Sequence, residues 1–167
     1  RDMVFNLCQY GMGNVWEWGR EVGGHSWRTS GDLIHEPERF IDIAIKNAQY
    51  GKYNGPGGWN DPDMLVLGQV GWGPELRQSR LTPDEQYSHI SLWCLLSAPL
   101  LLGCDLSQLD EFTLSLLTND EVLAVNQDML GTQARKIADK DGYQVWKKEL
   151  YDGSIAVGIF NTGSGDP

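Results

Sequence analysis

The feature that most constrains the fold is an alternation of strand-like and helix-like segments, which repeats four times before Gly131. Short apolar runs predict buried strands at 4–8, 26–30, 59–67 and 100–104. Helical patterns are expected from Pro37, from Pro83, over 107–117 and over 120–126. Thr82 and Glu85 predict a capping box at the start of the second of these helices. This alternation is typical of parallel βαβ units and predicts an α/β fold.

The chain changes character after Gly131. Residues 143–148 alternate between apolar and polar side chains, Asp152-Gly153 is a tight hairpin signal, and 154–160 alternate again. Asp139-Lys140-Asp141-Gly142 resembles a piece of a calcium loop but lacks the rest, so a hairpin turn explains it better. This pattern favours the opening of an antiparallel β domain. We therefore expect two domains, 1–131 and 132–167, with the change between Gly131 and Asp139.

Charge and cysteine content exclude several classes of function. The formal net charge of -10 argues against nucleic acid and anionic membranes as partners, and no apolar run is long enough to span a bilayer. The three cysteines, Cys8, Cys94 and Cys104, form neither a disulfide framework nor a Cys-x-x-Cys metal pair. A neutral substrate handled by carboxylates fits this balance, although simple solubility explains the acidity equally well.

The stretch Gly57-Gly58-Trp59-Asn60-Asp61-Pro62-Asp63-Met64-Leu65 carries the strongest chemical signal. It sets two carboxylates two residues apart on a turn framed by Gly and Pro, beside an indole. Sugar sites use such groups, because carboxylates bind hydroxyls and an aromatic face covers the ring. Together with Ser26-Trp27-Arg28-Thr29-Ser30-Gly31-Asp32, this stretch resembles glycoside hydrolase family 27, the family of α-galactosidases.

The resemblance implies a fold. Family members have a (β/α)8 TIM barrel followed by an antiparallel β domain, and four βα units cannot close such a barrel. We therefore expect the second half of the barrel in 1–131 and the beginning of a β-sandwich domain in 132–167. The missing N-terminal half-barrel of the same protein would precede Arg1, and the resemblance is compatible with a secreted, periplasmic or lysosomal-type location.

Asp32 is the first candidate catalytic residue. Retaining glycosidases use one carboxyl group as nucleophile and a second as acid and then base. In the family the acid/base is an aspartate shortly after a Trp-Arg pair, so the resemblance implies this role for Asp32. Arg28 would be its charged neighbour, which binds a sugar hydroxyl or steadies the ionised state. From the residues alone, Asp32 is as well explained as the cap of a turn before Leu33.

Other residues are predicted to bind the sugar. By resemblance, Asp63 and Met64 contact galactose, Trp59 supplies an apolar face, and Asp61 organises the strand end. A bare Asp-x-Asp pair could also bind a divalent cation, but no third ligand cluster accompanies it. We expect no metal and no organic cofactor.

The loop after the first strand is predicted to contact the substituent at the second carbon of the sugar. This chain has Cys8-Gln9-Tyr10 where many family members have Cys-Glu-Trp. Gln9 and Met12 are bulky, which favours a free hydroxyl over an acetamide. Trp16 and Trp18 either stack on a second sugar or anchor the glycine-rich loop that holds them.

The family nucleophile, an aspartate in a Lys-x-Asp pattern, has no counterpart here. The resemblance therefore implies a retaining hydrolase that cleaves terminal α-linked galactose from oligosaccharides or glycoconjugates, present as a fragment that is inactive alone. The alternatives are a non-catalytic carbohydrate-binding remnant, a β-L-arabinopyranosidase, an isomaltose-releasing dextranase and an α-N-acetylgalactosaminidase.

Overall fold

The computed structural model describes residues 3–34, 36–71 and 75–163. Its first sheet consists of three parallel strands in the order β1-β2-β3, with Trp27 opposite Asn60 and Arg28 opposite Asp61. The strands are Asn6–Leu7, Ser26–Arg28 and Trp59–Asp61. They are parallel, as predicted, but shorter than the apolar runs. The third strand ends where Pro62 lacks an N–H and Asp63 adopts a φ of 137°.

The strand predicted over 100–104 is wrong as a continuous element. This segment pairs with its neighbour only through bridges of Leu65 with Leu102 and of Val70 with Cys104, the first parallel and the second antiparallel. Hydrogen bonds from Leu65 N–H to the Leu101 carbonyl (2.7 Å) and from Gly103 N–H to the Leu65 carbonyl (3.0 Å) support the first bridge. The change in direction interrupts a regular ladder after one pair.

The predicted helices are present, except that the pattern over 107–117 divides into a 3-10 turn and a helix that begins at Glu111. A short helix also lies in the glycine-rich loop, where none was predicted. The α-helices are α1 Val15–Trp18, α2 Phe40–Ala48, α3 Pro83–Leu95, α4 Glu111–Leu117 and α5 Asp120–Asn126. Single 3-10 turns are η1 Met12–Asn14, η2 Pro37–Arg39, η3 Gly51–Tyr53 and η4 Leu106–Gln108. At the start of α3, Thr82 accepts a hydrogen bond from Glu85 N–H, and the Glu85 carboxylate accepts one from Thr82 N–H. The capping box read from the sequence is therefore confirmed. No helix within the described ranges is long and apolar enough to cross a membrane.

Two antiparallel sheets complete the structure. The predicted hairpins form a sheet of order β6-β7-β8, and a small hairpin, β4 with β5, was missed because its residues do not alternate. Asp141 and Gly142 have φ values of 53° and 80°, which suits the tight turn between β6 and β7. The strands are β4 Gln69–Val70, β5 Arg77–Gln78, β6 Arg135–Lys140, β7 Tyr143–Glu149 and β8 Ile155–Asn161.

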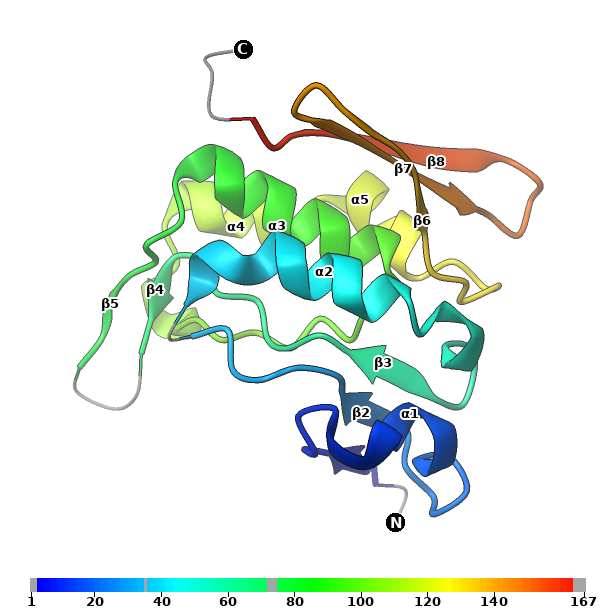
Figure 1. Ribbon diagram of the computed structural model, residues 1–167. Helices are drawn as coiled ribbons and strands as arrows, with labels where there is room; N and C mark the ends of the chain where they lie inside the picture. Colours follow the sequence, from blue (N-terminus) through cyan, green and yellow to red (C-terminus); the bar gives the residue numbers. More distant parts are fainter. Residues whose placement is uncertain (1–2, 35, 72–74, 164–167) are drawn as a thin grey trace.

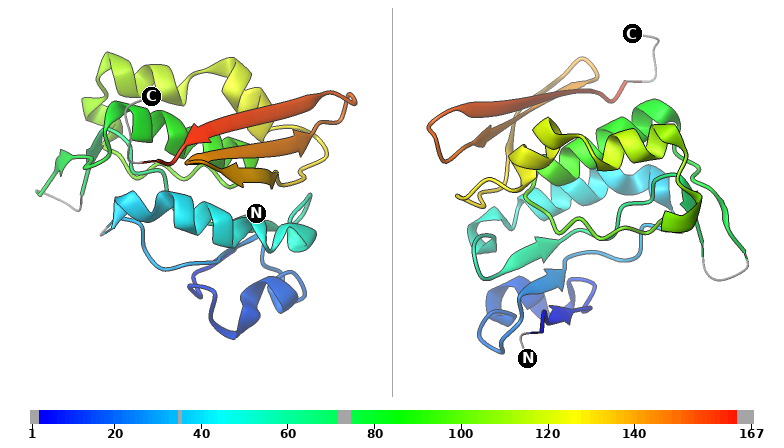
Figure 2. Two further views of the ribbon diagram at one scale, coloured as in Figure 1. Left: turned by 45° about the horizontal axis from the view of Figure 1, so that its top comes forward. Right: turned by 180° about the vertical axis from the view of Figure 1, so that it is seen from behind.

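Helices α2 to α5 form a layer between the two three-stranded sheets, whereas α1 lies beside β2 (Figure 1). The parallel strands lie below α2 and α3, and the antiparallel sheet lies above α3 and α5, an arrangement that two further views also show (Figure 2). Helix α3 contacts α2, α5, β7 and β8. Trp146 and Phe160 of the antiparallel sheet share one apolar core with Leu92 and Leu96, so the core crosses the predicted domain change.

A buried lysine joins the antiparallel sheet to two helix ends. Lys148 of β7 has no solvent exposure. Its Nζ donates to Ser97 Oγ (2.6 Å), to the Cys94 carbonyl (3.4 Å) and to the Val125 carbonyl, near the carboxyl ends of α3 and α5. Cations are stabilised at such ends, although burial still lowers the pKa of Lys148 to about 8.

We predict that Lys148→Ala lowers the free energy of unfolding by about 3 kcal/mol, because three oxygens lose their donor and a cavity remains. The pKa of about 8 in the folded protein lies below the value of about 10.4 for unfolded lysine. Between these values the folded state binds fewer protons than the unfolded state. The stability of the unsubstituted protein relative to the variant should therefore rise from about pH 8 to about pH 10. Urea denaturation at both pH values measures both effects.

Lys140→Ala is the matched control, since the Lys140 side chain is 83% exposed. It should change the unfolding free energy by less than about 0.5 kcal/mol. Equal losses in the two variants would show that the buried contacts of Lys148 contribute nothing.

Candidate active site

Most of the predicted site residues follow the carboxyl ends of the three parallel strands. Tyr10 comes after β1, Asp32 after β2 and Asp63 after β3. Parallel strands bring these ends to one edge of the sheet, which is where α/β proteins place their ligand sites. Arg28 is the last residue of β2 and lies opposite Asp61 of β3, so the strand register fixes the starting point of both loops.

One guanidinium holds two of the predicted carboxylates. Arg28 Nη1 lies 2.9 Å from Asp63 Oδ1, and Nη2 lies 3.1 Å from Asp32 Oδ1. The side chains of Arg28 and Asp63 are 8% and 3% exposed, whereas that of Asp32 is 43% exposed. The buried pair thus fixes the base of the site, and Asp32 is the carboxyl group that a solvent-borne substrate can reach.

The Asp63 carboxylate is largely occupied by backbone groups. Its Oδ2 accepts a hydrogen bond from Leu33 N–H at 2.5 Å, and its Oδ1 accepts one from Met64 N–H at 2.7 Å. Burial raises the pKa of Asp63, while the Leu33 N–H and the Arg28 charge oppose that rise. Asp63 therefore ties the loop that carries Asp32 to the end of β3.

Asp61 organises the strand end, as the sequence suggested. It has no solvent exposure, its Oδ1 accepts from Asp63 N–H (3.0 Å), and its Oδ2 accepts from the Asn6 amide (2.8 Å). Burial raises the pKa of Asp61, partly offset by the Asn6 hydrogen bond. Within the described residues, no three His, Cys, Asp or Glu side chains lie together as a metal would require.

The loop after β1 reaches over Arg28. The Tyr10 ring centre lies 5.5 Å from the guanidinium carbon, within the range of a cation–π contact. Gly11 N–H donates to the Arg28 carbonyl at 3.0 Å, and a Cβ on Gly11 would lie 2.6 Å from the Thr29 carbonyl oxygen. Gly11 has a φ of 82° and allows the loop to pack closely against β2. Gln9, at the start of this loop, is half-buried.

A cavity of about 580 Å³ is lined by Arg28, Trp59, Asp61, Asp63 and Met64, among others. Asp32 is not part of this lining and borders a separate cavity of about 420 Å³. Met64 fits there because of Gly103, whose Cβ, if present, would lie 2.6 Å from the Met64 sulfur. The sequence reading missed Gly103, and its only signal was a glycine inside an apolar run.

Trp59 occupies the other end of the strand. It is the first residue of β3, and its ring lies so close to Gly131 that a Cβ there would be 2.7 Å away. Trp59 lines the cavity and lies at the end of β3 opposite to Asp63. Its role as a sugar-binding residue stays a prediction.

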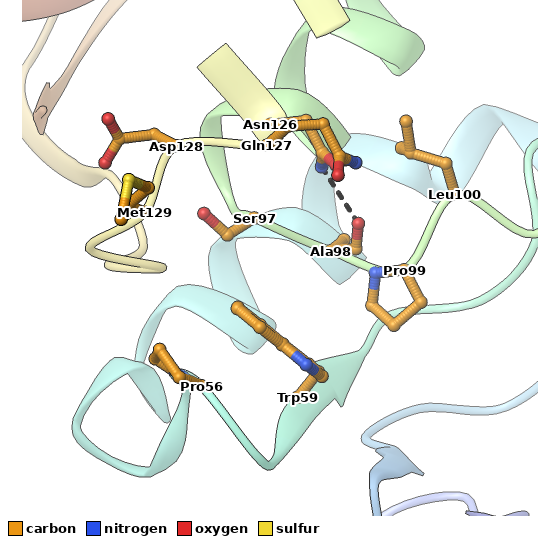
Figure 3. Close-up of a pocket in the computed structure, with 10 residues that line it drawn as sticks. All are labelled: Pro56, Trp59, Ser97, Ala98, Pro99, Leu100, Asn126, Gln127, Asp128 and Met129. Carbon is orange, nitrogen blue, oxygen red and sulfur yellow. Dashed lines mark hydrogen bonds between the residues drawn. The ribbon is translucent and has the colours of Figure 1, made fainter. Parts of the chain in front are cut away.

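Trp59 also borders a second cavity of about 430 Å³, which contains none of Arg28, Asp32 and Asp63 (Figure 3). Its polar groups already serve the fold. Asn126 donates to the Ala98 carbonyl at 2.9 Å, and the Asp128 carboxylate accepts from two backbone N–H groups, at 2.9 and 3.1 Å. Asn126 and Asp128 therefore have structural roles at the edge of this cavity.

The two tryptophans of the glycine-rich loop act as anchors. Trp18 Nε1–H donates to the Gly13 carbonyl at 2.8 Å. Trp16 stacks on Tyr50 with ring centres 3.7 Å apart. The first contact closes the loop on itself and the second ties it to the turn after α2, while both rings pack against the small core of Leu7, Val15 and Trp27.

Comparison with known proteins identifies what the chain is similar to. The profile of the family described as Alpha galactosidase A matches residues 20–128. Alpha-galactosidase 2 of Arabidopsis thaliana is 41% identical over 164 residues, which is 98% of this chain and 39% of that protein. A candidate α-galactosidase/melibiase from Bacteroides fragilis has a TM-score of 0.90 at 42% identity, covering 99% of this chain and 37% of the other.

A family 27 β-L-arabinopyranosidase from Geobacillus stearothermophilus is also similar in structure, with a TM-score of 0.78 at 35% identity. The match covers 89% of this chain and 34% of the other. The chain thus spans about two fifths of the length of the curated relatives it matches first.

Arg28→Met is predicted to lower the free energy of unfolding by about 3 kcal/mol, because it leaves the Asp63 carboxylate buried without its cation. Thermal and urea unfolding of the protein measure the loss. Arg39→Met is the control, since Arg39 and Glu36 form an ion pair whose side chains are 62% and 60% exposed. That variant should lose less than about 1 kcal/mol. Similar losses in the two variants would show that the buried ion pair contributes no more to the free energy of unfolding than the exposed pair does.

Proposed function

The chain belongs to glycoside hydrolase family 27, the α-galactosidase family, and on that premise we propose that it supplies the acid/base half of a retaining enzyme that cleaves terminal α-linked galactose. One observation carries the proposal. Asp32 is the solvent-facing carboxyl group on a guanidinium whose other partner, Asp63, is buried. The second half of a (β/α)8 barrel is the architecture that would place this group at the substrate.

In the proposed reaction, Asp32 acts twice. It first donates a proton to the departing glycosidic oxygen while a second carboxylate attacks the anomeric carbon and forms a glycosyl-enzyme. The ionised Asp32 then takes a proton from water, and the resulting hydroxide equivalent releases the sugar. Arg28 hydrogen-bonds Asp32 and keeps its carboxyl group oriented for both steps.

The second carboxylate is proposed to come from a segment outside these 167 residues, since the sequence contains no Lys-x-Asp. Asp63 does not suit that role, because its side chain is 3% exposed and it accepts from Arg28 and two backbone N–H groups. Activity would therefore require the longer protein, and the missing half-barrel is the partner that the site needs.

A second candidate substrate class is favoured by the structural similarity to the β-L-arabinopyranosidase. Arabinopyranose is galactose without its hydroxymethyl group. The proposed contacts of Arg28, Asp63 and Met64 do not by themselves separate the two sugars, so comparison of the two substrates decides between them.

We predict that Asp32→Asn, made in the longest natural protein that contains this chain, lowers kcat/KM for an aryl α-galactoside by about 10²- to 10⁴-fold, because the leaving oxygen loses its proton donor. The loss should be smaller for a substrate whose leaving group departs without a proton. Steady-state rates with one activated and one unactivated substrate measure both effects.

Asp141→Asn in the turn between β6 and β7 is the matched control, because the Asp141 side chain is 79% exposed and lies outside the Arg28 network; its activity should stay near that of the parent. The 167-residue chain alone should give no turnover. Full activity of Asp32→Asn would show that another residue is the general acid. A parent without hydrolytic activity but with galactose affinity would identify a carbohydrate-binding remnant instead.

The half-buried Gln9 predicts discrimination at the second carbon of the sugar. The seat of Gly11 on β2 fixes the loop that carries Gln9, so a larger substituent would require the loop to move. We expect kcat/KM for a 4-nitrophenyl α-galactoside to exceed that for its 2-acetamido analogue by at least about tenfold, as a steric clash of more than about 1.4 kcal/mol would produce. Equal rates would contradict this assignment.

A further inference from the structure

Asp63 has a strained backbone that two neighbours hold in place. Its φ of 137° lies in a region that side-chain-bearing residues rarely adopt, and such strain persists only where the surroundings enforce it. Asp61 Oδ1 accepts from the Asp63 N–H at 3.0 Å on one side. On the other side, the indole N–H of Trp93 donates to the Asp63 carbonyl at 2.7 Å.

Trp93 is itself rigidly placed. It lies on α3 with no solvent exposure, and its ring meets His89 edge-on with centres 4.2 Å apart. His89 Nε2 accepts from Val66 N–H at 3.2 Å, which fixes the imidazole in turn. Burial lowers the pKa of His89 to about 3, so the imidazole stays neutral and this stack does not change with pH near neutrality.

The Asp63 carbonyl belongs to the peptide that leads into Met64. Holding that carbonyl sets the direction of Met64 N–H, which donates to Asp63 Oδ1 at 2.7 Å. It also sets the Asp63 side chain against Arg28 and the Met64 side chain toward the cavity. Rotation of this peptide would disturb both predicted sugar contacts at once.

We propose that Trp93 is a positioning residue of the sugar site, which acts without touching the sugar by holding the Asp63-Met64 turn through its indole N–H. The inference rests on the proposed function. It assigns a role to a side chain that the sequence presents merely as part of the apolar pattern of a helix.

The test is Trp93→Phe in the intact parent protein, which removes the N–H and keeps an aromatic ring. The KM for an aryl α-galactoside should rise about five- to tenfold, as expected for one hydrogen bond, while kcat changes less than about twofold. The split is expected because the turn contacts the sugar similarly in the ground state and in the transition state, while Asp32 keeps its own hydrogen bond to Arg28 Nη2.

Trp146→Phe is the matched control. Trp146 is also without solvent exposure, and its indole N–H donates to Gln144 Oε1 at 3.2 Å within β7. This variant should lose thermal stability with an unchanged KM. If Trp93→Phe behaves in the same way, Trp93 is only a core residue and the inference is overturned.

A second measurement needs no variant and covers the case in which Trp93→Phe does not fold. In the ¹⁵N-labelled parent, the indole resonance of Trp93 should move when D-galactose is added, and that of Trp146 should not. A static Trp93 resonance under saturating galactose would overturn the inference.

The two proposals fail differently. An inactive Asp32→Asn variant together with an unchanged KM in Trp93→Phe removes the positioning role alone. A fully active Asp32→Asn variant and a parent that does not bind galactose remove the proposed function and this inference with it.

Discussion

The Arg28 guanidinium is the interaction on which the site depends. It joins the loops that follow two neighbouring strands, because one terminal nitrogen faces Asp63 and the other faces Asp32. Burying a carboxylate without a cation is costly, so the Asp63 position is tenable only while Arg28 stays at the end of β2. The register that sets Arg28 opposite Asp61 is therefore a requirement of the site as well as of the sheet.

The acidic residues around Arg28 differ in burial and in role. Asp61 and Asp63 are buried, and their carboxylate oxygens accept hydrogen bonds from Asn6 and from backbone N–H groups, so they stabilise the turn. Asp32 is exposed on the same network and keeps one oxygen without a protein donor among the described residues. A carboxyl group that exchanges protons needs such access, and the buried carboxylates keep it in place.

Local sequence signals predicted much of the fold. The capping box at Thr82 and the turns at Gly142 and Gly153 depend on a few adjacent residues, so pattern reading found them. The length of β3 was not predictable, because an apolar run continues past the point where Asp63 changes the backbone direction.

The resemblance to the family pointed to Arg28, Asp32 and Asp63, and these three residues share one ion-pair network, while their roles in catalysis and binding remain predictions. The contributions of Gly103 and Trp93 were not predicted. Each depends on a partner distant in sequence, and helical periodicity records that Trp93 is buried but not where its N–H points. Trp59 is next to Asn60 and Asp61 in the motif, but this closeness in sequence did not indicate that Trp59 lies at the amino end of β3, away from Asp63.

Helix α3 contacts both the Asp63-Met64 turn and the antiparallel sheet, which constrains where chimeric proteins can be joined. Its Trp93 reaches the turn beside Arg28, while the next residue, Cys94, and nearby Ser97 accept hydrogen bonds from Lys148 of the antiparallel sheet. A graft that replaced everything after Gly131 with the same region of a relative would alter the support beneath Trp93. Exchange of the sheet together with α3 would keep matched surfaces, so the natural unit of recombination includes part of the helical layer instead of beginning at Gly131.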